Sequence, residues 1–145
     1  LSLDTITYTP VFEYEQVLVM DKHHSLAEKP FIAPQDLSNE TLITYPIELS
    51  RLDVFTHFLT PANCTVKQHK TIETTEIILQ MVAAGRGITA LPKWLVEEAK
   101  ESELLACRSL GEEGVSKTLY LGHRNAQDVL GFVDDFIALS KIHTP

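Results

Sequence analysis

IETTEIILQMVAAGRGITALP, residues 72–92, combines a polar start, an apolar helix, a glycine stop and a short strand. Its apolar residues recur at spacings of three and four, which predicts an amphipathic helix with one buried face. Gly85 stands where a helix commonly ends in a left-handed residue, and the following "GITALP" is typical of a buried strand. The predicted buried face of the helix consists of Ile77, Ile78, Met81 and Val82.

Strand patterns lie on both sides of this stretch and alternate with helix patterns. Upstream, "EQVLVMD" (residues 15–21), "TLITY" (41–45) and "TVKQHK" (65–70) predict strands. Downstream, "KWLVEEAKE" predicts a helix, and "ELLACRSL" and "KTLYLGHR" predict two more strands. This alternation predicts an α/β domain with a largely parallel sheet.

Two further helices are predicted. "SRLDVFTHFLT" begins with Ser50, which can cap a helix, and Asp53 three residues later completes an acidic capping box. The last helix begins near Asp128 and has an apolar face that would favour self-association if it were left uncovered. The apolar faces are Leu52, Phe55, Phe58 and Leu59 in the first helix, and Val129, Phe132, Val133, Phe136 and Ile137 in the second.

The composition is that of one globular domain or one large lobe, with 145 residues, 44% of them hydrophobic. The net charge is −8 and the basic residues are scattered, so we expect no direct contact between this chain and DNA. No apolar run is long enough to cross a membrane, and "LSLDTITYTP" at the start lacks the features of a signal peptide. We therefore expect a cytoplasmic fragment whose natural start has been removed.

The sequence offers little for catalysis or metal binding. Cys64 has no evident base, and the pair His23 and His24 has no evident third ligand. The glycines of "AAGRGITALP" follow a helix and precede a strand, which is the reverse of the order in phosphate-binding loops. We expect no catalytic residue, no metal site and no bound nucleotide.

The starts of two helices are the candidate binding features. Ligands of parallel α/β sheets lie beyond the carboxyl ends of the strands, where the free N–H groups of helix starts favour a carboxylate. Ser50, Thr74 and Thr75 supply hydroxyls there, and Arg51 supplies a guanidinium. The alternative is that these hydroxyls are helix caps and nothing more.

Three segments carry a family resemblance. "TTEIILQMVAAGRGITALPKWLVEE" resembles the regulatory-domain signature of LysR-type transcriptional regulators. "LITYPIELSRLDVFTHFLTPA" and "TYTPVFEYEQVLVMDKHHSLA" are, more narrowly, similar to the methionine-biosynthesis activators of that family. Together these segments cover most of the chain.

The resemblance implies a regulatory domain like a periplasmic binding protein, with two α/β lobes joined by crossover strands. Residues 1–14 would be a crossover from a largely missing first lobe, and residues 15–116 the second lobe. Residues 117–145 would be the return crossover and the C-terminal helix of the first lobe. DNA would be bound only through a winged helix-turn-helix that precedes this chain, in a homodimer or tetramer.

The resemblance also implies a small-molecule effector, homocysteine, as co-inducer, with no other cofactor. Arg51 or the hydroxyls would meet its carboxylate, and Glu73 or Glu76 its ammonium group. The candidate effector-binding residues are Tyr45, Ser50, Arg51, Leu52, Thr74, Thr75 and Glu76.

These observations favour a non-enzymatic regulatory domain. One alternative is a stand-alone periplasmic-type module that binds an amino acid, which would carry a signal peptide and a complete first lobe. The other is an enzyme on the same fold, which would need a group of catalytic residues that this sequence does not display.

Overall fold

The computed structural model describes residues 7–123, and the chain divides into two compact units. The larger unit is Glu15–Val115. The smaller unit combines Leu1–Tyr14 with Ser116–Pro145, and its described part includes Phe12 stacked on Tyr14 with ring centroids 6.0 Å apart. The helix predicted from Asp128 onward, with its apolar face, lies outside the described residues.

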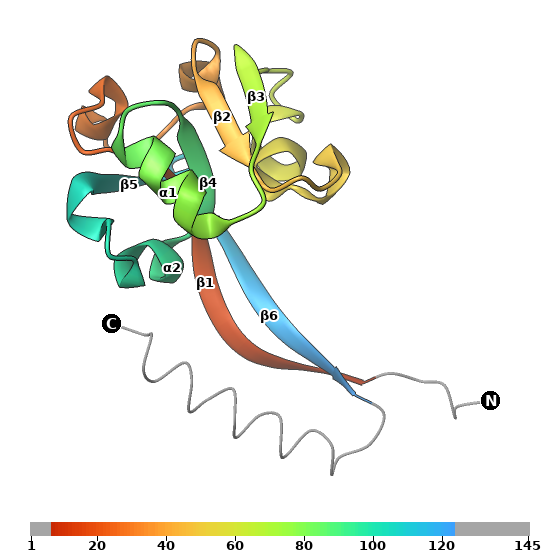
Figure 1. Cartoon of the computed structure of the whole chain (residues 1–145). Helices are drawn as coiled ribbons and strands as arrows, with labels where there is room; N and C mark the ends of the chain where they lie inside the picture. Colours follow the sequence, from red (N-terminus) through yellow and green to blue (C-terminus); the bar gives the residue numbers. More distant parts are fainter. Residues whose placement is uncertain (1–6, 124–145) are drawn as a thin grey trace. The chain divides into compact units, whose positions relative to one another are not determined.

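Within residues 7–123 the sheet has six strands, in the order β3-β2-β4-β1-β5, with β6 paired to β1 (Figure 1). Strand β2 runs parallel to β3 and β4, whereas β1 runs antiparallel to β4 and β5. The predicted α/β fold is therefore confirmed, and β2, β3, β4 and β5 share one direction; the sheet is mixed because β1 lies between β4 and β5 in the opposite direction. Helical crossovers join β2 to β3, β3 to β4 and β4 to β5, and each returns the chain to the same end of the sheet. The strands are β1 (Thr7–Asp21), β2 (Thr41–Thr44), β3 (Gln68–Thr71), β4 (Ile88–Pro92), β5 (Leu105–Ser109) and β6 (Val115–His123).

Two α-helices, four 3₁₀ turns and one π-helix connect the described strands. The α-helices are α1 (Thr75–Ala83) and α2 (Lys93–Glu98). The 3₁₀ turns are η2 (Ser25–Glu28), η3 (Pro34–Leu37), η4 (Leu49–Arg51) and η6 (Ser102–Leu104), and η5 (Val54–Leu59) is a π-helix. No helix in the part of the chain that the structure describes is long and apolar enough to cross a membrane.

The α-helix predicted from Ser50 is replaced by η4 and η5. Leu52 between them has an extended backbone, with φ −98° and ψ 115°, so the helix cannot run through it. In η5 the Thr60 N–H donates to the carbonyl of Phe55, five residues back. This wider turn changes which residues face the core: Val54, Phe58 and Leu59 are buried, whereas Leu52 and Phe55 are only partly buried.

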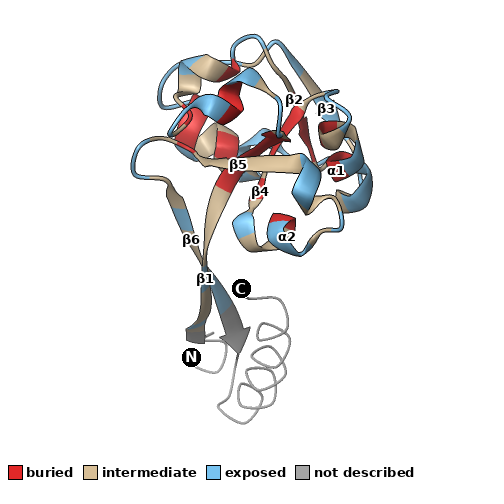
Figure 2. Cartoon of the chain, turned by 90° about the vertical axis from the view of Figure 1, so that its left-hand side faces the viewer, coloured by how far each residue is buried: buried red, intermediate tan, exposed pale blue. Residues whose placement is uncertain are grey.

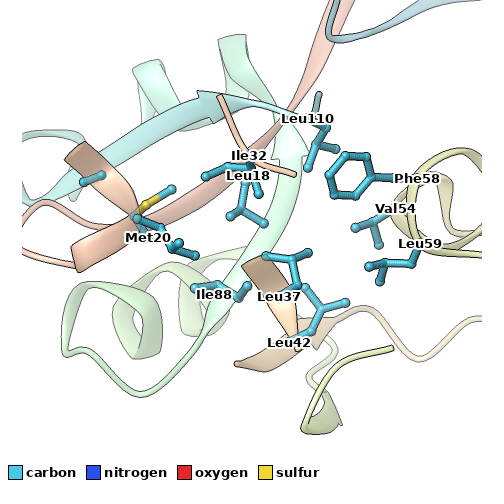
Figure 3. Packing of buried hydrophobic residues seen from close by; sticks show 12 residues of the cluster. Leu18, Met20, Ile32, Leu37, Leu42, Val54, Phe58, Leu59, Ile88 and Leu110 are labelled. Atoms are coloured by element: carbon cyan, nitrogen blue, oxygen red, sulfur yellow. The ribbon is translucent and has the colours of Figure 1, made fainter. Parts of the chain in front are cut away.

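Side chains of successive strand residues point to opposite faces of the sheet, and buried residues fill both faces. Figure 2 shows the buried stretches of the chain in red. On one face, Leu18, Met20, Leu42 and Ile88 pack beneath η2, η3 and η5, with Phe58 and Leu59 among the covering residues (Figure 3). On the other face, Val17, Val19, Ile43 and Leu91 pack beneath α1 and α2. The larger unit is thus a three-layer structure with the sheet in the middle.

The buried stripe of α1 differs by one residue from the predicted one. Ile78 and Val82 are buried and Met81 is partly buried, as predicted, but Ile77 is 48% exposed and Leu79 takes a place in the core. The helix is therefore rotated toward Leu79, which leaves Ile77 on the surface of its first turn.

Two glycines fix the connection from α1 to β4. Gly85 has a φ of +75°, which confirms the predicted left-handed stop of the helix. Gly87 serves a different purpose, since a Cβ there would lie 2.9 Å from the carbonyl oxygen of Thr41 and from Cδ1 of Ile43. The absence of a side chain lets β4 begin directly beside β2.

We expect Gly87→Ala to lower the free energy of unfolding by about 1–3 kcal/mol, because the new methyl group would overlap a backbone oxygen that cannot rotate away. Gly85→Asn is the matched control, since asparagine tolerates positive φ, and should cost less than about 1 kcal/mol. Urea denaturation of both variants measures the difference, and equal stabilities would contradict the close-approach explanation.

Candidate ligand-binding site

The predicted site residues follow the carboxyl ends of the parallel strands. Tyr45 comes directly after β2, and Thr74 and Thr75 come three and four residues after β3, where α1 begins. Because β2 and β3 are neighbours and run in the same direction, their carboxyl ends lie at one edge of the sheet (Figure 1). This is the edge at which open α/β sheets bind ligands.

Tyr45 and Thr75 are brought into direct contact. The tyrosine hydroxyl and the Thr75 hydroxyl form a short hydrogen bond between β2 and α1. The Tyr45 ring is partly buried and packs against the core cluster beneath α1. The contact ties the start of α1 to the end of β2 and places two hydroxyls together at the edge of the sheet.

Thr74 occupies the N-cap position of α1 but does not cap it in the predicted way. Its backbone is extended, with φ −116° and ψ 137°, and its carbonyl accepts the N–H of Ile78. Its hydroxyl, however, accepts no N–H group of the described helix, and the residue is exposed. The N–H groups of the first turn, which have no partner inside a helix, therefore lie beside an exposed hydroxyl.

Glu76 lies in the same turn but contacts a different element. Its carboxylate is 3.0 Å from Lys100 Nζ and 3.4 Å from Gln80 Nε2. The hydrogen bond and charge of Glu76 raise the pKa of Lys100. Both side chains are mostly exposed, so this surface ion pair contributes little to stability.

Ser50 and Arg51 belong to η4, and both are exposed, while Leu52 is partly buried against the core. Glu48, not Ser50, precedes the turn as its N-cap, so the predicted capping role of Ser50 is wrong. The reason is the extended Leu52, which ends the turn after Arg51. Within the described residues, no hydrogen bond joins Ser50 or Arg51 to Tyr45, Thr74 or Thr75.

Two residues beside the site were not predicted. Thr44, the last residue of β2, is buried, and its hydroxyl lies 2.6 Å from Nε2 of His69 on β3. The rings of His69 and Phe55 lie edge to face, with ring centroids 5.3 Å apart. The only sequence signal was the alternation of "TVKQHK", which puts His69 on the opposite face from Gln68 and Lys70.

Burial shifts the pKa of two side chains in the larger unit. It lowers the pKa of His69 below its ordinary value, because the ring loses water that would solvate the charged form. It raises the pKa of Cys107 to about 11, so this free thiol stays protonated at neutral pH and is a poor nucleophile. Among residues 7–123, no cluster of His, Cys, Asp and Glu side chains could hold a metal ion.

Comparison with known proteins gives a family match over nearly the whole chain. Residues 2–143 match the model of the LysR substrate binding domain. The HTH-type transcriptional regulator MetR of Escherichia coli K12 is 41% identical over 136 residues, which are 94% of this chain and 42% of that protein. MetR of Haemophilus influenzae is 32% identical over 138 residues, 95% of this chain and 44% of that protein. The chain thus spans less than half the length of these relatives.

Solved structures share the fold. The regulatory domain of MetR from Neisseria meningitidis superimposes with a TM-score of 0.82 at 32% identity, covering 90% of this chain and 62% of that one. The reduced OxyR regulatory domain of Pseudomonas aeruginosa superimposes with a TM-score of 0.68 at 20% identity, over 98% of this chain and 68% of that one. The second likeness concerns the fold alone, and both confirm the predicted regulatory-domain architecture.

We expect the Tyr45–Thr75 contact to be measurable by a double-mutant cycle. Tyr45→Phe and Thr75→Val each remove one hydroxyl with little change of shape, and the coupling between them should be about 1 kcal/mol. Urea denaturation of the two single variants and the double variant gives this value. Tyr120→Phe, at an exposed tyrosine of β6, is the control and should leave stability unchanged. Additive effects of the first two substitutions would show that the hydroxyls are not coupled.

We also expect His69 to make stability depend on pH. Because its pKa is lowered in the folded chain, its contribution is fully present above the ordinary value of 6.5 and is lost as the pH falls toward the lowered pKa. The wild type should therefore lose more stability between about pH 7.5 and about pH 5.5 than His69→Gln, whose side chain does not titrate. Equal losses in urea denaturation would contradict the burial of the neutral ring.

Proposed function

The chain belongs to the LysR substrate-binding domain family, and we propose that it is the effector-binding part of a MetR-like transcriptional regulator of methionine biosynthesis that senses homocysteine. The identity of 41% to MetR of Escherichia coli over 94% of this chain supports this assignment. The whole protein would act in the cytoplasm as a homodimer or tetramer and bind DNA through a separate helix-turn-helix. Residues 1–14 would be the crossover from the first lobe, residues 15–116 would form the second lobe, and residues 117–145 would be the return crossover and the C-terminal helix of the first lobe.

The observation that carries the ligand proposal is the group of hydroxyls at the start of α1. Tyr45 and Thr75 are joined there, and the exposed Thr74 lies beside the free N–H groups of the first turn. These groups and the positive end of the helix dipole suit a carboxylate. Homocysteine has one carboxylate, one ammonium group and a short thiol chain, so it needs few polar partners.

The remaining candidates have different parts in this proposal. Arg51 is exposed in η4 and would add a charge-assisted hydrogen bond to the carboxylate. Leu52 would contribute apolar surface for the thiol chain. Glu76 would accept the ammonium group only by giving up Lys100, so the exposed Glu73 is the better acceptor.

The proposed mechanism is a shift between conformations rather than a reaction. Homocysteine would favour the arrangement of the whole protein in which its contacts are strongest, and this preference would change how the DNA-binding parts are held. The free-energy shift between the two arrangements would equal the difference between the binding free energies of homocysteine for them.

We expect homocysteine to bind the whole protein that contains this chain, and calorimetric titration tests this. Arg51→Ala should weaken binding about ten- to hundredfold, because a charge-assisted hydrogen bond is lost, and Thr74→Ala about three- to tenfold. Arg86→Ala removes an exposed arginine after the opposite end of α1 and is the matched control, with an expected change below about twofold.

Two outcomes would count against the proposal. Equal affinity in the wild type, Arg51→Ala and Thr74→Ala would remove both residues from the site. Absence of any heat of binding in the wild type, under conditions in which the protein is folded, would remove homocysteine as the ligand.

A further inference from the structure

We propose that His69 is a positioning residue of the candidate site, which holds in place the turn after β2 that carries Tyr45 and leads to Ser50 and Arg51. Its effect on effector binding rests on the proposed function. Its effect on the turn does not, and the two can be tested separately.

The inference begins with a relay of two hydrogen bonds. His69 Nε2 lies 2.6 Å from the Thr44 hydroxyl, and that hydroxyl donates to the carbonyl oxygen of Tyr45 over 3.0 Å. Thr44 is only 5% exposed, so water does not compete freely for its hydroxyl. A ring on β3 therefore determines the orientation of a group that bonds to the backbone of Tyr45.

The proton arrangement of this relay is fixed by what each atom can do. A carbonyl oxygen only accepts hydrogen bonds, so the single proton of the Thr44 hydroxyl points to Tyr45. The hydroxyl must then accept from His69, which places a proton on Nε2. The neutral ring with its proton on Nε2 satisfies both bonds, and burial favours that neutral ring.

The carbonyl at the end of the relay closes the turn. It also accepts the N–H of Ile47 over 2.8 Å, which makes a three-residue turn around Pro46. Directly after Ile47, Glu48 is the N-cap of η4, and its carbonyl accepts the N–H of Arg51 over 2.9 Å. The carbonyl oxygen of Tyr45 thus accepts two hydrogen bonds. The direction in which the chain leaves β2, and hence the position of Ser50 and Arg51, depends on these two bonds.

Packing holds the ring in the position that the relay requires. Phe55 of η5 meets the His69 ring edge to face at an interplanar angle of 63°. Backbone pairing sets β3 beside β2, with His69 opposite Leu42 in the register. His69 thus connects η5, β3 and β2 to the segment that holds the candidate residues.

Three substitutions distinguish the effect of the hydrogen bond from the effect of the volume of the ring. His69→Leu keeps apolar volume but removes the donor, His69→Gln keeps an N–H donor at similar reach, and Thr44→Val removes the hydroxyl from the other partner. Gln68→Leu is the control, since it replaces an exposed polar residue of the same strand with the same apolar side chain.

The first measurement uses this chain without ligand. Nitrogen NMR of the imidazole should show the proton on Nε2. The backbone amide signals of Ile47 and Arg51 should shift in His69→Leu and in Thr44→Val, but stay near the wild-type positions in His69→Gln and Gln68→Leu. A wild-type ring with its proton on Nδ1, or unchanged amides in folded Thr44→Val, would overturn the proposal even if His69→Leu does not fold.

The second measurement is the affinity of the whole protein for homocysteine. His69→Leu should weaken binding about tenfold, His69→Gln should restore it to within about threefold, and Gln68→Leu should bind like the wild type. Affinity in folded His69→Leu equal to that of the wild type, or no rescue by glutamine, would overturn the positioning role. If the wild type does not bind homocysteine, the proposed function fails, and the amide signals still decide whether His69 holds the turn.

Discussion

The parallel pairing of β2 with β3 and β4 is the constraint on which the candidate site depends. Each crossover between these strands must return the chain to the same edge of the sheet, so the residues that follow β2 and β3 meet there. Tyr45 reaches Thr75 for this reason, although thirty positions separate them in the sequence. The close approach of β4 to β2 at Gly87 extends this group of strands; β5 runs in the same direction, and β1 lies between β4 and β5 in the opposite direction.

Periodicity made most of this fold predictable. Alternating β-branched residues identified the strands, and the spacing of Ile78 and Val82 together with Gly85 identified α1 and its end. Prediction failed where a local pattern was compatible with more than one geometry. The run after Ser50 has helical spacing, but the extended Leu52 and the π-helix that buries Val54 are set by the core above the sheet. The antiparallel placement of β1 between β4 and β5 was not predicted, because a strand's sequence does not record its direction.

The candidate site was predictable in its place but only partly in its contacts. The position of Tyr45, Thr74 and Thr75 follows from the order of strands and helices, which the sequence displays. The pairing of Glu76 with Lys100 and the relay from His69 through Thr44 depend on residues 24 and 25 positions apart whose side chains meet only after the sheet has formed. No spacing rule links such residues. The proposed recognition of a small zwitterion rests on the hydroxyls at this edge, with Arg51 and Glu73 as the charged partners.

The hydrogen bond between Tyr45 and Thr75 has a consequence for ligand selection. In the proposed site the Thr75 hydroxyl has one proton, and where it donates to Tyr45, a carboxylate can accept that hydrogen bond only by an exchange of partners. Its net gain is the difference between a charge-assisted bond and a neutral one, and a neutral isostere such as an amide gains almost nothing. In that arrangement Tyr45 competes with the ligand, and an anion would displace it more readily than a neutral group, before the first lobe closes over the site.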